Sequence, residues 1–246
     1  MSAEHVEIKT EDGIADGYLA RPADDDGRLP GVLFLVDAFG LRPQVEQMAD
    51  RISERGFVVL APNVFYRHGR APVLPMPNLE DPDERAPFME KIRPMMQELT
   101  PELMASDSRG YLDFLAEVAR GPFAIVGYCM GARLGWRIAT AHPDRVVALA
   151  GFHAGGLVTD AEDSPHLSAG ELTAEVYLGH ADNDRSMTSE NIAALERALR
   201  EADVSYRSEL YEGAAHGYTM ADTSSYDEGA AERHFEALFA LLDRTI

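Results

Sequence analysis

The only cysteine of the chain sits between two glycines, where the sequence pattern changes from strand to helix. Residues 124–126 are apolar, as in a buried strand, and the run stops at Gly127. Cys129 follows, then Gly131, and residues 134–141 have the apolar spacing of a helix. Glycine neighbours let strand and helix approach closely around a strained residue, and the dipole of the following helix favours a thiolate. The pattern predicts a nucleophile elbow with Cys129 at its apex.

A thiol needs a base, and His216 lies where one is expected. It occupies a loop of small residues, 213–217, between the last predicted strand and the last predicted helix. A histidine near Cys129 can take the thiol proton, and a carboxylate can hold that histidine in the required tautomer. Asp184 is the preferred acid because the residues around it resemble the acid loop of such enzymes. Asp182 remains the alternative, with a turn hydrogen bond as its other role.

The remaining histidines are weaker candidates for the base. His5, His142 and His234 are expected at the surface, whereas His153 and His180 follow predicted strands and could line a pocket. The chain order would then be nucleophile, acid, histidine, which is the order of the α/β-hydrolases.

An oxyanion formed by attack of the thiolate would need backbone N–H donors. The residue after the nucleophile, Met130, should supply one of them. The other should come from Ala38, in the loop that follows a buried apolar run at 31–36. The neighbours of Ala38 and two further residues near strand ends are candidates for the substrate pocket. These four are Asp37, Phe39, Tyr128 and His153.

The order of the predicted elements places these residues at one edge of a sheet. Strands and helices alternate from residue 31 onward, which predicts a mostly parallel sheet covered by helices on both faces. In such sheets the active site lies beyond the carboxyl ends of the strands. The segment 62–87 is rich in proline and acidic residues and has no clear period, so we expect a loop there, with helix resuming at about Phe88. We expect a single domain over residues 1–246.

Composition excludes several other classes of function. The chain of 246 residues has a net charge of -20, so neither nucleic acid nor an anionic membrane surface is expected as a partner. One cysteine cannot form an intrachain disulfide, which suits a reducing cytoplasm. No signal peptide and no apolar run of about 20 residues is found. We therefore expect a cytoplasmic monomer or small homo-oligomer.

Three motifs in the expected order resemble the dienelactone hydrolase family. They are Gly127-Tyr128-Cys129-Met130-Gly131, the Asp184 loop and Ala215-His216-Gly217, and the similarity extends over nearly the whole chain, including residues 37–40. The resemblance implies an α/β-hydrolase fold and a Cys-His-Asp triad without metal or cofactor. It also implies hydrolysis of small carboxylic esters or lactones, since the founding activity opens dienelactone to maleylacetate.

The sequence departs from this family at two places near the pocket. A glutamate of the founding enzymes interacts with the resting thiol, and Asp37 stands in its position. Because a buried carboxylate needs a partner, we favour a contact of Asp37 with Cys129 that holds the thiol protonated. If Asp37 cannot reach the thiol, Cys129 would instead pair with His216 as a thiolate, and Asp37 could merely cap a turn or the following helix. The founding enzymes also carry an arginine shortly after the catalytic histidine, which is missing here. Arginines from the 62–87 segment could replace it, namely Arg67, Arg70 and Arg85.

A different class of function is a redox-sensing protein that binds a ligand on the same scaffold. Cys129 would then be an oxidisable switch rather than a nucleophile. A sensor needs neither an acid nor an oxyanion loop, so the presence of both favours the enzyme.

Overall fold

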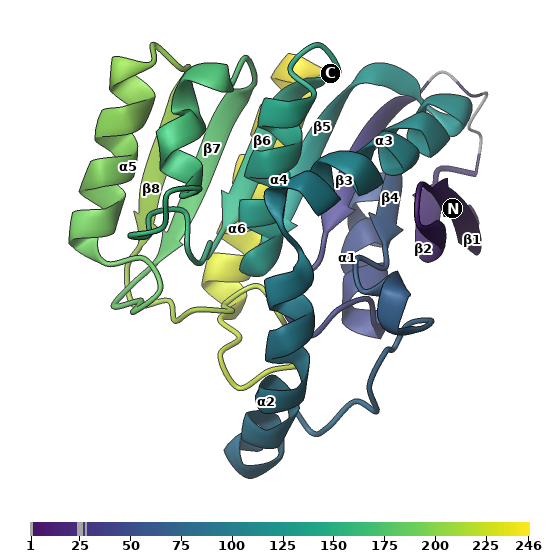
Figure 1. Cartoon of the computed structure of the whole chain (residues 1–246), viewed down its shortest axis with the longest axis horizontal. Helices are drawn as coiled ribbons and strands as arrows, with labels where there is room; N and C mark the ends of the chain where they lie inside the picture. The colour runs from purple at the N-terminus through teal and green to yellow at the C-terminus, as the bar shows by residue number, and fades with distance from the viewer. Residues whose placement is uncertain (1, 24–26, 28) are drawn as a thin grey trace.

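The computed structural model describes residues 2–23, 27 and 29–246. One sheet of eight strands, in the order β1-β2-β4-β3-β5-β6-β7-β8, forms the centre of the molecule (Figure 1). The β1–β2 and β2–β4 pairs are antiparallel and every other pair is parallel. The mostly parallel sheet confirms the prediction. The strands are Ser2–Thr10 (β1), Gly13–Arg21 (β2), Pro30–Leu35 (β3), Val58–Pro62 (β4), Arg120–Tyr128 (β5), Val146–Phe152 (β6), Glu175–Ala181 (β7) and Tyr206–Tyr211 (β8).

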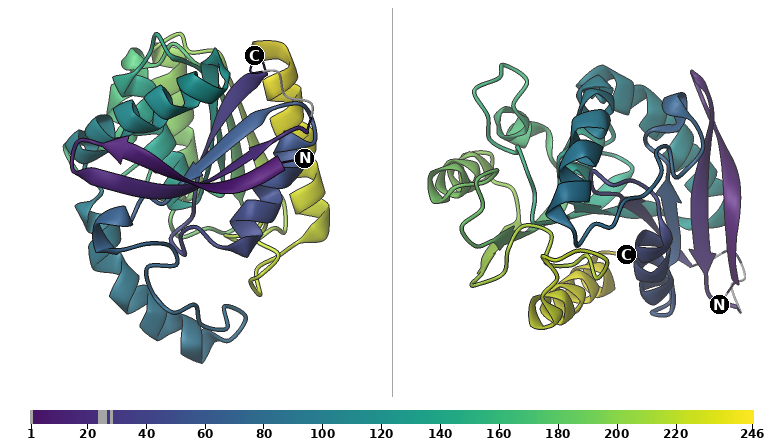
Figure 2. Two further views of the ribbon diagram at one scale, coloured as in Figure 1. Left: turned by 90° about the vertical axis from the view of Figure 1, so that its right-hand side faces the viewer. Right: turned by 90° about the horizontal axis from the view of Figure 1, so that it is seen from below.

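Helices cover both faces of the sheet. α1 and α6 pack on one face and α3 and α4 on the other, as the view from below shows (Figure 2). The central strands β3 and β5 are therefore buried on both sides, which explains why their sequences contain continuous apolar runs. The helices are Pro43–Ser53 (α1), Pro82–Glu98 (α2), Pro101–Val118 (α3), Met130–Ala141 (α4), Ser189–Glu201 (α5) and Glu228–Thr245 (α6), with short 3₁₀ helices at Tyr66–His68 (η1) and Pro165–Glu171 (η2).

Helix α2 is longer than the sequence pattern suggested. It begins at Pro82 rather than near Phe88, because Asp81 caps it and proline suits the first turn. The Asp81 side chain accepts a hydrogen bond from the backbone N–H of Asp83 at 2.9 Å. Much of this helix projects beyond the body of the molecule (Figure 1). Phe88 and Ile92 are its buried residues, and the ring of Phe88 packs against that of Phe39, in the loop after β3, with centroids 5.8 Å apart.

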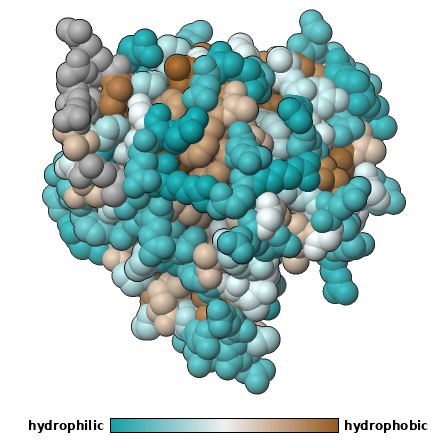
Figure 3. All heavy atoms as spheres, turned by 180° about the vertical axis from the view of Figure 1, so that it is seen from behind, coloured by the Kyte–Doolittle hydropathy of each residue, from teal (hydrophilic) through white to brown (hydrophobic). Residues whose placement is uncertain are grey.

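The surface is mostly hydrophilic. Seen from behind, hydrophilic residues cover most of the face (Figure 3). Few large apolar side chains of the described residues are exposed, and they are scattered: Ile14, Leu167, Leu210 and Tyr226. None of the described helices is long and apolar enough to cross a bilayer.

Candidate active site

The turn between β5 and α4 holds Cys129 in a strained conformation. Its backbone has φ 52° and ψ -114°, and α4 begins at the next residue. Two close approaches require the flanking glycines. A Cβ on Gly127 would lie 2.3 Å from the carbonyl oxygen of Gly131, and one on Gly131 would lie 2.2 Å from that of Leu35. The local sequence therefore builds the predicted elbow, and it presents the thiol beyond the carboxyl ends of β3 and β5.

Three side chains that are distant in sequence form a chain of hydrogen bonds here. The Nε2 atom of His216 lies 3.0 Å from the sulfur of Cys129. The other ring nitrogen, Nδ1, lies 2.6 Å from Oδ2 of Asp184. His216 comes from the loop after β8 and Asp184 from the loop after β7, so both follow the carboxyl ends of parallel strands. An imidazole thus contacts the sulfur, and a carboxylate contacts the imidazole.

The charge state of His216 follows from these contacts. Burial disfavours the imidazolium, but the hydrogen bonds to Asp184 and Cys129 outweigh it and raise the pKa of His216 to about 10. Burial also opposes the charge of Asp184, yet its hydrogen bond to His216 holds the pKa of the carboxyl below the usual value. Asp184 is therefore ionised at neutral pH and stabilises the protonated imidazole.

Ser186, which the sequence analysis did not identify, binds the second oxygen of the Asp184 carboxylate. The hydroxyl of Ser186 donates to Oδ1 at 2.7 Å, and its backbone N–H donates to the same oxygen at 2.8 Å. Asp182, the alternative acid, instead accepts from the N–H of Gly213 at 2.9 Å, which is the turn role considered for it. A serine two residues after an aspartate is a local signal of such a turn.

The two residues suggested as oxyanion donors, Ala38 and Met130, each line a cavity together with Cys129. Met130 opens α4, so its N–H has no acceptor within the helix. Ala38 lies in the turn closed by the bond from the N–H of Gly40 to the carbonyl of Asp37 at 3.1 Å. Both residues are almost fully buried, and within the described part of the chain neither N–H donates a hydrogen bond to a protein acceptor. Both remain available to an oxyanion.

The side chain of Asp37 does not hold the thiol. Arg42 donates to its two carboxylate oxygens at 2.7 and 3.0 Å, and the N–H of Phe39 donates to Oδ1 at 3.0 Å. Arg42 also binds Asp222, at 2.6 and 3.1 Å. The expected contact with Cys129 is therefore wrong, because a buried arginine five residues along supplies the partner that the carboxylate needs. The carboxylate instead fixes the turn that carries Ala38.

A cavity of about 300 Å³ opens over the sulfur. Asp37, Phe39 and His153 line it, as predicted, together with Arg85, one of the arginines suggested for an anionic substrate, and with apolar residues that the sequence did not single out. These apolar residues include Met89 and Met220. Of the arginines proposed for an anionic substrate, Arg67 pairs with Asp12 and Asp107 and Arg70 with Glu7, so only Arg85 faces this cavity.

Tyr128 lies behind the elbow rather than in the cavity. Its fully buried ring stacks on Phe34 and Phe152, and its hydroxyl bonds to Nε2 of His234 at 3.1 Å. Side chains alternate along a strand, so the residue before Cys129 points to the opposite side of the sheet. The same contact corrects the expectation for His234, which is completely buried in α6.

His153 forms the inner wall of the cavity. Its Nε2 lies 2.7 Å from the hydroxyl oxygen of Thr219, and its ring meets that of His216 edge to face, with centroids 5.3 Å apart. Burial lowers the pKa of His153 well below its ordinary value, so the ring is neutral beside the charged His216. The described residues contain no cluster of three or more histidine, cysteine, aspartate or glutamate side chains that could hold a metal ion.

Comparison with known proteins supports the resemblance seen in the motifs. The chain is 26% identical over 242 residues to a candidate carboxymethylenebutenolidase of Salmonella typhi, covering 94% of this chain and 83% of that protein. It is 25% identical to the carboxymethylenebutenolidase of Rhodococcus opacus, over 86% of this chain and 79% of the relative. The crystal structure of a candidate dienelactone hydrolase from Klebsiella pneumoniae subsp. pneumoniae MGH 78578 superposes with a TM-score of 0.86 at 21% identity, over 99% and 98% of the two chains. The sequence model of the dienelactone hydrolase family matches residues 15–246, and the chain therefore belongs to that family.

Proposed function

We propose that this protein hydrolyses lactones or small carboxylic esters by covalent catalysis at Cys129. The observation that carries the proposal is the continuous contact from the sulfur to His216 and on to Asp184, at 3.0 and 2.6 Å, beneath a cavity of about 300 Å³. Membership of a family with carboxymethylenebutenolidase relatives supports the same class of reaction. The substrate is a small molecule whose reacting carbonyl reaches the sulfur beside this cavity.

In the first half of the reaction, the Cys129 sulfur attacks the carbonyl carbon of the ester or lactone. The carbonyl electron pair moves onto oxygen, and the N–H groups of Ala38 and Met130 stabilise the resulting oxyanion. His216 holds the thiol proton and gives it to the alkoxide as the carbon–oxygen bond breaks. A thioester on Cys129 and a free alcohol result, and in a lactone the alcohol stays attached to the acyl chain.

In the second half, a water molecule replaces the alcohol. His216 takes a proton from the water, which attacks the thioester carbonyl, and the same two N–H groups bind the oxyanion again. Collapse of this intermediate releases the carboxylic acid and returns the sulfur to its pair with His216. Throughout, Asp184 keeps Nδ1 of His216 protonated, so that Nε2 faces the reacting atoms.

The test is substitution of the nucleophile. Cys129→Ala should lower kcat for 4-nitrophenyl butyrate by about 10⁵-fold or more, because no acyl-enzyme can form. Cys129→Ser should also be strongly impaired, because a hydroxyl is much harder to deprotonate than a thiol. Circular dichroism should show an unchanged fold in both variants. Substantial hydrolysis by the alanine variant would contradict covalent catalysis at this residue.

A further inference from the structure

A second cavity, of about 370 Å³, lies on the other side of the nucleophile. It shares Cys129 and His216 with the first cavity, but its remaining wall comes from α2, α4 and the loops after β6 and β7. Two thioether side chains and two arginines line this wall: Met96, Met130, Arg133 and Arg185. Arg185 is exposed, whereas Arg133 is half-buried. Neither the arginine of the first cavity, Arg85, nor Asp37 borders it.

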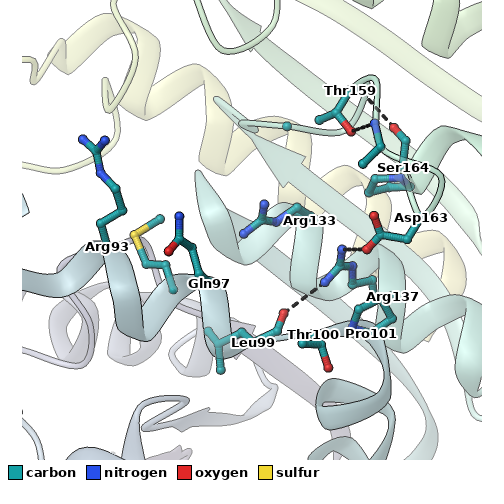
Figure 4. A pocket seen from close by; sticks show the side chains of 14 residues that line it. Arg93, Gln97, Leu99, Thr100, Pro101, Arg133, Arg137, Thr159, Asp163 and Ser164 are labelled. Atoms are coloured by element: carbon teal, nitrogen blue, oxygen red, sulfur yellow. Dashed lines mark hydrogen bonds and ion pairs between the residues drawn. The ribbon is translucent and has the colours of Figure 1, made fainter.

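The second cavity continues into a third, of about 450 Å³, which Figure 4 shows. The two share Met96, Arg133 and Gly156. The guanidinium of Arg133 points into this space, across from Gln97 (Figure 4). It lies over the backbone of the loop after β6, since a Cβ on Gly156 would be 3.7 Å from its Nη1. Arg133 thus stands where the two cavities join.

Arg133 has no partner of its own. Among residues 2–23, 27 and 29–246, none forms a hydrogen bond or ion pair with its guanidinium, although its Nε atom is buried. Arg137, one turn further along α4, binds Asp163 at 2.9 Å and the carbonyl of Leu99 at 3.0 Å. Burial, together with the charge of Arg133, lowers the pKa of Arg137. The two arginines therefore repel each other, and in the described part of the chain only Arg137 has a carboxylate partner.

Arg133 differs in its burial from most of the other described basic side chains that lack an ion pair. Those that are exposed are Lys9, Lys91, Arg93, Arg120, Arg185 and Arg197, whereas Arg133 is half-buried with a buried Nε atom. A buried guanidinium donor without an acceptor costs free energy, and an anionic ligand would remove that cost. The position is close to the reacting atoms. Four residues of helix separate Arg133 from Cys129, a rise of about 6 Å, and helical side chains lean toward the N-terminal end.

We propose that Arg133 binds an anionic group, a carboxylate or a phosphate, at the far end of the acyl chain whose carbonyl reacts with Cys129. The acyl chain lies along Met96 and Met130 in the second cavity, and the leaving alcohol occupies the first. This assignment rests on the proposed hydrolase function. It makes Arg133 a specificity-determining residue, which selects acyl groups that end in a negative charge.

The first test compares two esters that differ only in charge. Mono-4-nitrophenyl adipate ends in a carboxylate, and 4-nitrophenyl methyl adipate carries the neutral methyl ester instead. We expect Arg133→Gln to lower the ratio of their kcat/KM values, anionic over neutral, by at least tenfold, whereas Arg133→Lys should keep part of it. The matched control is Arg197→Gln, on the exposed face of α5, which should leave the ratio unchanged. An unchanged ratio in Arg133→Gln, or an equal loss in Arg197→Gln, overturns the assignment.

The second test measures binding without turnover. Calorimetry on the Cys129→Ala protein, with and without Arg133→Gln, uses adipate and inorganic phosphate as ligands. Loss of at least tenfold in affinity for adipate alone supports a carboxylate site, and loss for both supports a general oxyanion site. No loss for either overturns the proposal. If the wild-type protein hydrolyses neither ester, the hydrolase function fails, and this measurement still decides whether Arg133 binds an anion.

Discussion

At the scale of single residues, the hydrogen bonds of Asp184 and Asp182 separate two candidates that the sequence left open. Asp184 contacts His216 at 2.6 Å, whereas Asp182 holds the N–H of Gly213. We expect Asp184→Asn to lower kcat by roughly 10⁴-fold, because an amide cannot stabilise the imidazolium or fix its tautomer. Asp182→Asn should cost less than about tenfold. The reverse ranking would move the acid role to Asp182.

The same Asp184→Asn variant should change the titration of His216. The carboxylate is one of the groups that raise the pKa of His216 to about 10. Without it, the imidazole should lose its proton at a distinctly lower pH. NMR titration of the ring protons against the wild-type protein measures the change, with Asp182→Asn as the matched control. Identical midpoints in all three proteins would contradict the electrostatic coupling described here.

The buried ion pair of Asp37 leads to a different expectation for the thiol. Because Arg42 holds the carboxylate, Asp37→Asn should leave the pH profile of Cys129 alkylation by iodoacetamide unchanged. His216→Gln should change that profile, because it removes the side chain 3.0 Å from the sulfur. A profile that shifts in Asp37→Asn would restore a direct effect of this carboxylate on the nucleophile.

Several of these residue roles could be predicted from sequence and others could not. Cys129, His216 and Asp184 stand in local patterns of small residues or turns that follow predicted strands, and such patterns are readable without a structure. The pair of Asp37 with Arg42 is also local in sequence. Asp222, however, binds Arg42 from 180 positions away, and no local sequence pattern predicts that contact. The placement of Tyr128 was an avoidable error, since strand alternation already turns it away from Cys129.

At the scale of elements, the elbow depends on how closely β5, α4 and β3 approach one another. A Cβ on Gly131 would lie 2.2 Å from a backbone carbonyl of β3, and no side-chain movement can relieve that clash. We expect Gly131→Ala to destabilise the fold by at least about 3 kcal/mol, or to displace the elbow and abolish activity. Urea unfolding measures the first effect and alkylation of Cys129 the second.

A suitable control for that substitution is Gly170→Ala in η2. A Cβ there would meet no heavy atom within 4 Å, so stability and activity should be retained. If Gly131→Ala were equally harmless, the close approach would not constrain the elbow.

Two helices show where sequence patterns succeed and fail. The buried residues of α6 recur at helical spacing, and His234 falls on that buried face, so its burial could have been predicted from its position. The start of α2 was harder to find, because Pro87 and Pro94 lie inside the helix and interrupt the pattern. Its cap at Asp81 was the available signal.

At the scale of the whole molecule, buried neutral histidines make stability depend on pH. Burial lowers the pKa of His234 to about 3, whereas a histidine in the unfolded chain titrates near 6.5. Below pH 6.5 the unfolded state therefore binds a proton that the folded state does not. We expect the free energy of unfolding to fall by about 2 kcal/mol between pH 7 and pH 5 from His234 alone.

Urea unfolding at several pH values tests this linkage. His234→Gln removes the titrating group, so its stability should depend less on pH than that of the wild-type protein. The control is His5→Gln, because the His5 side chain is largely exposed and its loss should leave the dependence unchanged. Equal pH dependence in wild type and His234→Gln would show that the buried imidazole does not contribute.

The meeting of two cavities at one sulfur has a consequence for the order of events in turnover. In the proposed reaction the alcohol occupies the cavity of about 300 Å³ and the acyl group that of about 370 Å³. The alcohol can then depart, and water can take its place, while the acyl group stays bound. Such an enzyme follows ping-pong kinetics, and added methanol competes with water to yield the methyl ester. It would then act as a transferase as well as a hydrolase.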